Sequence, residues 1–344
     1  MTAPKLKTLV TGSSGFIAGY LIGELLAHGH EVVGLDNHSK YGAVARGFDA
    51  NPAYAQVVGD AKDVDLLAGL LADCDHFIAN AAIIGGISLF HELAYDLLAE
   101  NERITAAAFD AAIRAHKLGR LKKITVVSSS MVFESSDVFP TPEGEQRRCP
   151  PPGSTYGFQK LATEYFAQGA RQQYGLPYTI VRPFNCVGVG EKRARYDREV
   201  LSGNVRLALS HVVPDLVQKV LKGQDPLRLL GDGTQVRHYT YGGDLARGIR
   251  LAVESPDALN DDFNLSTATS TTVLELAGAI WKAIRGDEPL RVAFDEPYTY
   301  DVRRRVPSVE KARRVLGFEA TTTLDEALGE IIPWVRDQIA VGGI

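Results

Sequence analysis

Short apolar runs alternate with longer amphipathic stretches along the first half of the chain. The runs are rich in β-branched residues and predict strands at Lys7–Val10, Glu31–Leu35, Ala55–Val58, His76–Ala79, Lys123–Ser128 and Tyr178–Arg182. The stretches between them have apolar residues at helical spacing and predict helices at Ile17–His28, Asp63–Leu71, Leu97–Ala115 and Tyr156–Tyr174. Apolar strands that alternate with helices are typical of an α/β fold, with a parallel sheet covered by helices on both faces.

The pattern changes after Arg182. Residues 186–232 are expected to be mixed loop and helix, and residues 232–241 to be polar and extended. Further helices are predicted at Asp244–Glu254, Val273–Ile284, Val309–Leu316 and Leu324–Val341. No linker rich in Pro, Ser and Gly separates the two halves. We therefore expect a large domain of residues 1–185 plus roughly 235–265, with a smaller α/β C-terminal lobe of residues 186–234 plus 266–344 packed on it.

A glycine-rich turn follows the first predicted strand, in the sequence TGSSGFIAG that begins at Thr11. Gly12 permits a tight turn, and Gly15 lets the backbone approach a pyrophosphate. Ala18 or Gly19 lets the next helix pack close to the strand. The start of that helix supplies free N–H groups and the positive end of the helix dipole, which together bind phosphate. The sequence therefore predicts a dinucleotide site on a Rossmann-type, doubly wound sheet.

Asp36 ends the second predicted strand and favours NAD over NADP. An acidic residue about 20 positions after the glycines accepts hydrogen bonds from the adenosine ribose, and its charge repels a 2′-phosphate. Asp60 follows the third predicted strand. There it either bonds the adenine amino group or caps a helix over Ala61–Leu66.

Tyr156 and Lys160 lie four positions apart, so on a helix they share one face. A neighbouring ammonium favours phenolate, and we expect it to lower the pKa of Tyr156 from about 10 toward neutrality. Such a tyrosine can take a proton from a substrate hydroxyl while a serine that follows a strand, Ser129 or Ser130, bonds the same oxygen. Lys160 can also hold the nicotinamide ribose. The competing interpretation is a surface helix start capped by Ser154.

These motifs and others spread over nearly the whole chain resemble the extended short-chain dehydrogenase/reductases, specifically the NAD-dependent nucleotide-sugar epimerase/dehydratase family, which includes UDP-glucose 4-epimerases. The remaining matching pieces are Asn80-Ala81-Ala82, Asn101, Ser128–Phe133, Arg182-Pro183-Phe184-Asn185, Gly231-Asp232-Gly233 with Arg237, Asp244, and Lys311–Phe318. The resemblance implies NAD as the cofactor and a nucleotide-diphosphate sugar, most simply a UDP-sugar, as the substrate.

The resemblance also implies a role for each matching residue. Tyr156 is the base and Lys160 its partner. Ser129 is the hydroxyl partner because it lies four residues before Phe133, which stands in the place of the family's aromatic residue; Ser130 is the second choice. The implied cofactor-binding residues are Gly12, Ser14, Gly15, Phe16, Ile17, Asp36, Asn37, Asp60, Ala61, Ala81, Ala82, Asn101, Tyr156 and Lys160. The implied substrate-binding residues are Ile84, Ser129, Asn185, His211, Arg237 and Arg304.

Alternatives remain open at three of the substrate positions. A guanidinium fork suits phosphate oxygens, so Arg237 is expected on the diphosphate, but it could instead pair with Asp232 or Asp244. Residues 303–305 are three successive arginines, of which one binds the diphosphate or all lie on a solvated strand edge. His211 either contacts the ligand or caps a helix. Residues 191–204 are expected to form a flexible loop that closes over the substrate.

The residues beside the catalytic serine favour one reaction of the family. Its 4,6-dehydratases carry an Asp-Glu pair after the catalytic threonine, its GDP-mannose 3,5-epimerases a cysteine, and its decarboxylases often a glutamate, whereas Ser130 and Met131 stand here. A 4-epimerase needs only the tyrosine, lysine and serine. Elimination therefore favours C4 epimerisation through a 4-keto sugar. A decarboxylase, dehydratase or 4-keto reductase on the same scaffold is the alternative, and a non-catalytic dinucleotide-binding regulatory protein is the alternative of another class, against which the intact Tyr156, Lys160 and Ser129 argue. Glu134, Cys186, Glu191 and His211 are further groups whose chemistry is unassigned, although a buried thiol is the simpler interpretation of Cys186.

Composition and charge limit the partners, ligands and cellular location that we expect for the chain. The net charge of −5 gives no reason to expect a nucleic-acid partner, and no apolar run reaches the roughly 20 residues that span a bilayer. The three cysteines match neither a zinc site nor a disulfide framework, and the first residues do not resemble a signal peptide, so we expect no metal and a cytoplasmic protein. In the family, helices equivalent to Leu97–Ala115 and Tyr156–Tyr174 form the interface of a homodimer, which we expect here too.

Overall fold

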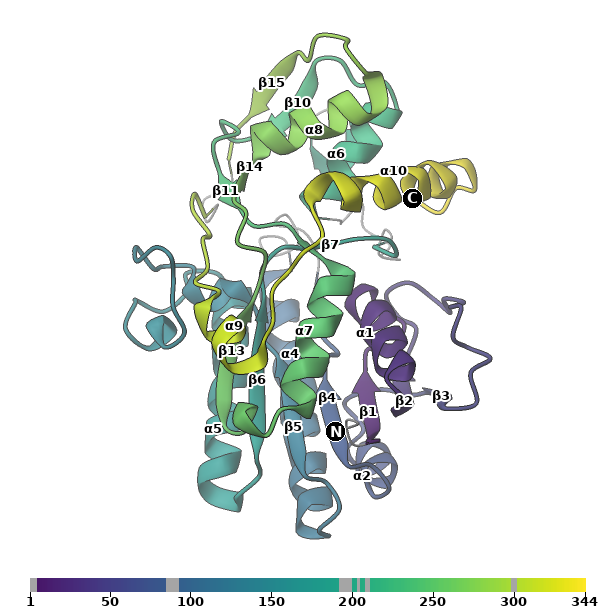
Figure 1. Ribbon diagram of the computed structural model, residues 1–344, viewed down its shortest axis with the longest axis vertical. Coiled ribbons are helices and arrows are strands. Elements are labelled where there is room, and N and C mark those ends of the chain that lie inside the picture. The colour runs from purple at the N-terminus through teal and green to yellow at the C-terminus, as the bar shows by residue number, and fades with distance from the viewer. Residues whose placement is uncertain (1–4, 85–92, 192–199, 203–204, 208–210, 298–301) are drawn as a thin grey trace.

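A seven-stranded parallel sheet forms the centre of the molecule (Figure 1). The computed structural model describes residues 5–84, 93–191, 200–202, 205–207, 211–297 and 302–344. The strands run in the order β13-β6-β5-β4-β1-β2-β3. Their bounds are β1 Lys7–Thr11, β2 Glu31–Asp36, β3 Tyr54–Val58, β4 His76–Ala79, β5 Lys123–Val127, β6 Tyr178–Pro183 and β13 Asp261–Leu265. The predicted doubly wound α/β sheet is confirmed.

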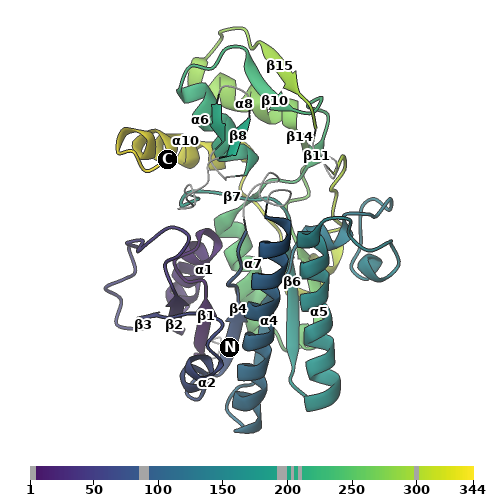
Figure 2. The ribbon, with the colours of Figure 1, turned by 180° about the vertical axis from the view of Figure 1, so that it is seen from behind.

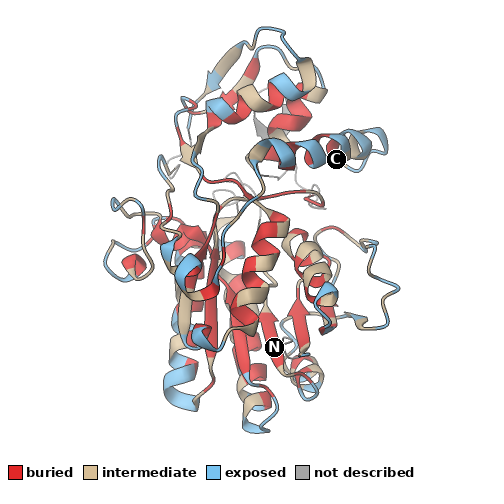
Figure 3. Ribbon diagram, in the orientation of Figure 1, coloured by how far each residue is buried: buried red, intermediate tan, exposed pale blue. Residues whose placement is uncertain are grey.

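Helices cover both faces of this sheet. One face carries α2 (Val64–Leu71), α4 (Ala94–Lys117) and α5 (Thr155–Tyr174), which are nearest the viewer in Figure 2. The other carries α1 (Phe16–Ala27), α7 (Gly242–Glu254) and α9 (Glu310–Leu316), which are nearest in Figure 1. The strands between them are largely buried, as Figure 3 shows, which explains their nearly continuous apolar sequences.

The C-terminal lobe has an apolar core of its own. Its main elements are α6 (Val212–Leu221), α8 (Val273–Arg285), α10 (Leu324–Ala340) and the parallel pair β10 (Leu227–Leu230) and β15 (Val292–Asp295). Leu216, Leu276, Trp281 and Ile331 are buried together there. Short elements complete the described chain: β7 Cys186–Val187, β8 Val200–Ser202, β9 Val205–Leu207, β11 Val236–Arg237, β12 Thr240–Tyr241, β14 Thr271–Thr272, and the 3-10 turns η1 Ser130–Phe133, η2 Glu145–Arg147 and η3 Pro256–Ala258.

The structure differs from the predicted division of the chain in one segment. The predicted lobe includes α9, but Ala312, Leu316 and Phe318 pack into the core of the large domain beside Phe263 of β13 and Ile249 of α7. The chain therefore returns from the lobe to the sheet and then goes back into the lobe to form α10, as the yellow segment of Figure 1 shows. These two crossings add to the connections after β6, before α7 and after β13 that join the lobe to the sheet.

A cavity of about 640 Å³ lies between these carboxyl ends and the lobe. The loops after β1 and β4 open into it. These strands are neighbours in the sheet, but the chain leaves them in opposite directions. Ligands of doubly wound sheets bind in the crevice at such a reversal of strand order. Among the helices of the described residues, none has the length and apolar character needed to cross a membrane.

Candidate active site

The glycine turn between β1 and α1 is shaped for close approach of a ligand. Gly12 has a φ of +70°, and a Cβ there would lie 3.0 Å from the Cα of Ala81. A Cβ on Gly15 would lie 2.9 Å from the carbonyl oxygen of Gly12. Gly15 is also the N-cap of α1 and offers no capping side chain, so the N–H groups of the first turn stay available to a phosphate. Gly12, Ser14, Gly15, Phe16 and Ile17 all line the cavity, as the sequence predicts.

Asp36 is held in place at the end of β2. Its two carboxylate oxygens accept hydrogen bonds from the backbone N–H groups of Ser14 (3.1 Å) and His38 (2.7 Å). Asp36 and Asn37 line the cavity next to the glycine turn. This places a fixed negative charge where the ribose of a dinucleotide would lie.

Asp60 does not cap a helix. The N-cap of α2 is Asp63, whose side chain accepts from Asp65 and Leu66. Asp60 instead accepts the N–H of Lys62 (2.9 Å) and lines the cavity together with Ala61. A contact between Asp60 and adenine therefore stays a prediction.

The loop after β4 forms another wall. Ala81, Ala82 and Ile84 line the cavity. Asn101 of α4 is buried behind them: its side chain accepts from the N–H of Ile83 (2.7 Å) and donates to the carbonyl of the same residue (2.9 Å). Asn101 is absent from the lining of the cavity, so its position supports the loop rather than a direct contact with the cofactor. The rest of this loop, residues 85–92, lies outside the described residues.

Tyr156 is in the cavity wall and not on the surface. It sits in the first turn of α5, which Ser154 caps by accepting the N–H of Gly157 (3.0 Å). Only 3% of Tyr156 is exposed, and it packs against Met131 and Ile84. Ser129, the N-cap of η1 at the end of β5, hydrogen-bonds the phenol. Ser129, Ser130, Tyr156 and Lys160 all line the cavity, so the structure brings the predicted catalytic group together.

The prediction that Lys160 lowers the pKa of Tyr156 toward neutrality is wrong when only the residues of the protein act on the phenol. Burial raises the pKa of Tyr156 to about 12, and the hydrogen bond from Ser129 and the charge of Arg305 oppose this rise only in part. The Lys160 ammonium lies 6.0 Å from the centre of the phenol ring and donates to the carbonyl of Val127 (3.0 Å). Burial lowers the pKa of Lys160 itself to about 8. Desolvation therefore outweighs the attraction that the four-residue spacing suggests.

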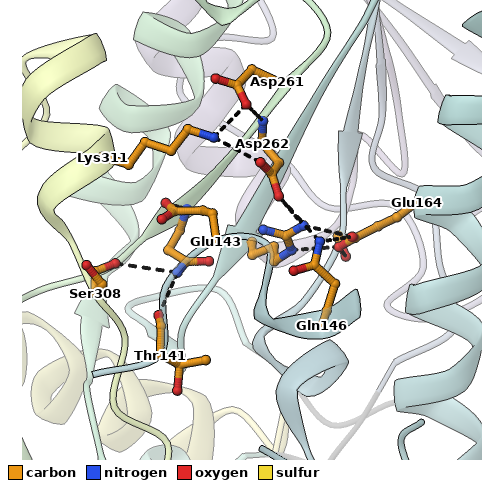
Figure 4. Close-up of polar contacts among 11 residues, drawn as sticks. Thr141, Glu143, Gln146, Glu164, Asp261, Asp262, Ser308 and Lys311 are labelled. Atoms are coloured by element: carbon orange, nitrogen blue, oxygen red, sulfur yellow. Dashed lines mark hydrogen bonds and ion pairs between the residues drawn. The ribbon is translucent and has the colours of Figure 1, made fainter. Parts of the chain in front are cut away.

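A buried ion network joins α5, the helix that carries Tyr156 and Lys160, to the strands β6 and β13 (Figure 4). Arg182 of β6 is fully buried and donates to Glu164 of α5 twice, at 2.7 Å each, and to Asp262 of β13 at 2.6 Å. Glu164 also accepts from Ser128 (2.7 Å), the neighbour of Ser129. Figure 4 shows how Lys311 of α9 bridges Asp261 and Asp262. The network ties α5, the end of β5 and the edge strand β13 into one unit.

Glu134 and Cys186 are two further ionisable groups in the cavity wall, and the Oε1 of Glu134 has no hydrogen-bond partner among the described residues. Glu134 accepts both the N–H (2.9 Å) and the hydroxyl (2.8 Å) of Ser154, so it orients the start of α5. Burial raises the pKa of the Cys186 thiol far above its usual range, with Glu191 adding to the effect, so this thiol stays protonated. Met131 packs against Tyr156 in an apolar cluster and brings no acid–base group to it.

On the substrate side, Asn185, His211 and Arg237 line the cavity. Asn185 has a φ of +35°, and its Nδ2 is buried with no hydrogen-bond partner among the described residues. An unsatisfied buried donor on a strained residue indicates a place for a ligand acceptor. The side chain of His211 bonds Glu191 rather than capping α6. Burial alone would raise the pKa of Glu191, but the charge and hydrogen bonds of His211 lower it below its usual value.

Arg237 does not form either of the surface ion pairs considered above. Asp232 pairs with Arg303, and Asp244 pairs with Arg247. Arg237 itself donates to the carbonyl of Val236 (3.0 Å) within the cavity wall. A diphosphate role for Arg237 is therefore compatible with its position.

The choice of Arg304 as a substrate residue needs correction. Arg304 is exposed and lies over the ring of Phe139, 4.5 Å from its centre, away from the cavity lining. Its neighbour Arg305 lines the cavity. The segment runs extended beside Val236, and successive side chains of an extended chain point to opposite sides, so only one of the two can face the site.

Sequence reasoning missed several charged residues of the cavity. Burial lowers the pKa of Lys40, on the loop after β2, to about 8, with the charge of Glu191 opposing this. Lys219 pairs with Asp215 (2.8 Å) on α6 at the lobe end. The four-residue spacing of Asp215 and Lys219 could have indicated that they pair on a helix. Nothing in the sequence, however, shows that α6 faces the sheet. The predicted closing loop of residues 191–204 lies largely outside the described residues.

Comparison with known proteins decides the family. Residues 8–266 match the profile of the NAD dependent epimerase/dehydratase family. The chain belongs to this family. It is 28% identical to UDP-glucose 4-epimerase of Mycolicibacterium smegmatis, over 97% of this chain and 99% of that protein. It is 26% identical to UDP-N-acetyl-alpha-D-glucosaminuronate decarboxylase of Bacillus cytotoxicus, over 97% and 98%. The crystal structure of UDP-glucose 4-epimerase from Thermotoga maritima with UDP-glucose superimposes with a TM-score of 0.79 at 26% identity, covering 97% of this chain and 99% of that one.

The residues present fit NAD, the cofactor of the family. The Gly12–Gly15 turn leaves a cradle that a Cβ would fill, α1 presents uncapped N–H groups, and Asp36 lies at the end of the neighbouring strand. Gly12 and Gly15 would bring the backbone to the pyrophosphate, Asp36 would hold the adenosine ribose, and Lys160 would hold the nicotinamide ribose.

Proposed function

We propose that this member of the family is a nucleotide-diphosphate-sugar 4-epimerase, which acts on a UDP-sugar through transient oxidation at C4. One observation carries the proposal: Tyr156, Ser129 and Lys160 share a cavity wall with the glycine turn, and the place beside them that would need a second acid or base holds Met131. The likeness to UDP-glucose 4-epimerases over nearly the whole chain supports the same reaction.

The chain's own residues would divide the work as follows. Tyr156 takes the proton of the C4 hydroxyl, and Ser129 donates a hydrogen bond to the same oxygen. NAD, when bound, supplies the acceptor and donor of the C4 hydride. After the 4-keto ring turns over, Tyr156 returns the proton to the oxygen on the other face. Arg237 and Asn185 hold the diphosphate during the turn, so that only the sugar moves.

The two parts of the molecule have separate roles in this proposal. The large domain binds NAD, and the lobe binds the nucleotide sugar through Lys219, Arg228 and Leu229, which line the far end of the cavity. A second candidate function is decarboxylation, favoured by the likeness to the Bacillus cytotoxicus enzyme. Incubation with UDP-glucose and UDP-glucuronate, followed by NMR of the products, tests both. The proposal predicts the C4 epimer, whereas carbon dioxide and a pentose product would replace it with the second candidate.

We also propose a homodimer built on α4 and α5. These helices pack side by side on one face of the sheet (Figure 2). Their outer sides expose large aromatic residues, namely Tyr95 on α4 and Phe158, Tyr165, Phe166 and Tyr174 on α5. An apolar patch of this kind typically marks a protein interface. The free thiols of Cys74, Cys149 and Cys186 support a reducing compartment, such as the cytoplasm.

A further inference from the structure

Arg46 places its guanidinium against the glycine turn between β1 and α1, behind the part of the turn that lines the cavity. Arg46 lies on the loop between β2 and β3. Its Nη2 donates to the carbonyl oxygens of Gly15 (3.1 Å) and Ser14 (3.4 Å). Ser14 and Gly15 line the cavity, whereas Arg46 does not. The cation therefore contacts the backbone of the proposed pyrophosphate cradle from outside the cavity.

Two glycines leave the space that the guanidinium fills. A Cβ on Gly19 of α1 would lie 2.7 Å from the Cζ and Nη1 of Arg46, and a Cβ on Gly190 would lie 3.1 Å from Nη1. The segment of Gly190 is docked on α1, because the N–H of Val189 donates to the hydroxyl of Tyr20 (2.7 Å). Gly19, the last glycine of the sequence motif, therefore makes room for an arginine side chain.

The hydrogen bond to Gly15 acts on an N–H group that is placed to bind phosphate. The carbonyl of Gly15 and the N–H of Phe16, the first residue of α1, belong to the same peptide group. The first N–H groups of a helix have no acceptor within the helix and can bind an anion. A cation on the carbonyl oxygen polarises the peptide group, so its N–H becomes a stronger donor.

The positive charge of Arg46 also favours an anion across the turn. Arg46 forms no ion pair among the described residues: the carboxylate of Asp49 attracts its charge but accepts the backbone N–H of Arg46 instead (2.8 Å). The side chain is partly buried, and its Nε is buried with no hydrogen-bond partner in the described part of the chain. Removing a cation from water is costly unless a negative charge compensates it. The pyrophosphate of NAD would supply that charge.

We infer that Arg46 is a positioning residue of the cofactor site, which fixes the glycine turn from behind and strengthens the binding of a diphosphate on the other side. The inference concerns the cofactor alone, so it holds whichever sugar the enzyme acts on. Because Arg46 acts on the phosphate groups, its loss should weaken ligands that carry a diphosphate and spare those that carry only adenosine.

Binding of ADP and of adenosine separates this role from a general loss of structure. The full-length protein, freed of NAD, is titrated with each ligand by NMR as wild type, Arg46→Met, Arg46→Lys and the control Arg250→Met. Arg250 supports the other end of α1 through Glu24 (2.8 Å). We expect Arg46→Met to weaken ADP by about tenfold and adenosine by less than about twofold, because only ADP carries the charge that Arg46 attracts. Arg46→Lys should recover part of the affinity for ADP, and Arg250→Met should change neither ligand.

Gly19→Ala tests the same contact while the arginine stays in place. Its Cβ would push the guanidinium away from the turn, so it should weaken ADP more than adenosine and add nothing to the effect of Arg46→Met in the double variant. The melting temperature of each variant shows that it is folded. Equal losses of ADP and adenosine in Arg46→Met would make this arginine merely structural. Unchanged binding of ADP in a folded Arg46→Met or Gly19→Ala protein would also overturn the inference.

Discussion

Ser129 is the residue whose hydrogen bond does most to ease ionisation of Tyr156. Burial holds the pKa of the phenol at about 12, and the serine hydroxyl stabilises the charged form. In Ser129→Ala that support is lost, so the pKa rises further. The rising limb of kcat/KM against pH should move to higher pH, and activity near neutral pH should fall by about 100-fold.

The matched control is Ser130→Ala. Both serines line the cavity, but of the two only Ser129 makes a hydrogen bond that shifts the pKa of the Tyr156 phenol. Ser130→Ala should therefore reduce activity much less, and the rising limb of kcat/KM against pH should stay at the same pH. Equal losses in the two variants would argue against the assignment of Ser129.

At the scale of single residues, the sequence best predicted those residues whose chemical role requires a fixed position relative to a strand or helix. Gly12, Asp36 and Tyr156 could be predicted because each has a fixed offset from the end of a strand or helix. Arg304 could not be separated from Arg305 in this way, since the direction of each side chain depends on how the extended segment pairs with Val236. Lys40 was missed because only the folded cavity shows that its ammonium is desolvated.

The turn between β1 and α1 depends on glycine at the scale of the element. In Gly12→Ala, the left-handed φ of +70° costs about 1 kcal/mol, and the new Cβ would lie 3.0 Å from the backbone of Ala81. We expect the variant to lose most of its bound NAD, as measured by absorbance of the released cofactor. Gly278→Ala, in α8 with no atom within 4 Å of the new Cβ, should keep its NAD and gain roughly 0.5–1 kcal/mol of stability. Full NAD occupancy in Gly12→Ala would count against the proposed pyrophosphate cradle.

Ion pairs hold the edge strand β13 in place as much as its backbone hydrogen bonds with β6 do. Burial alone would raise the pKa of Asp262, but the charges of Arg182 and Lys311 keep it well below its usual range. A depressed pKa in the folded state adds stability above the unfolded pKa, near 3.9, and this stability is lost as the pH falls below that value. Asp262→Asn should therefore cost roughly 2–4 kcal/mol at pH 7, and its urea unfolding curve should approach that of the wild type as the pH drops toward 3.

The control for this charge is Asp65→Asn. Asp65 pairs with Arg114 on the surface of α2 with 91% of its side chain exposed, so little change is expected at any pH. If Asp262→Asn lowers the free energy of unfolding by the same amount at every pH, packing and not charge holds the strand.

The long amphipathic helices and the apolar strands were predicted to within a few residues, since side-chain caps such as Ser154 and left-handed Gly175 mark their ends. β13 was missed for a physical reason. Its first two residues are Asp261 and Asp262, which read as a polar turn until the buried partners from β6 and α9 are known. Among the described residues, the lobe strands β10 and β15 pair only with each other, and they are far apart in the sequence, so no local pattern reveals that pairing.

At the scale of the whole molecule, the exposed aromatic face of α4 and α5 predicts an oligomer. Tyr165 is 57% exposed, and Tyr165→Glu should put a charge into the proposed dimer interface. Light scattering after gel filtration should give twice the mass of one chain for the wild type and one chain for the variant. Val341→Glu, on an apolar residue that is 75% exposed at the end of α10, should stay dimeric. A wild-type protein that elutes as a single chain would refute the dimer.

The active site itself is a property of the whole molecule, because its walls come from segments separated by more than half the chain. The central claim is that Tyr156 drives reversible oxidation at C4, and a deuterium label at C4 tests it most directly. Purified protein is incubated with C4-deuterated UDP-glucuronate and UDP-glucose, and the products are analysed by NMR. We expect a C4 epimer that keeps its deuterium at C4, and no product from Tyr156→Phe. Deuterium lost to solvent or found at C6, or a C4 epimer formed equally well by Tyr156→Phe, would contradict it.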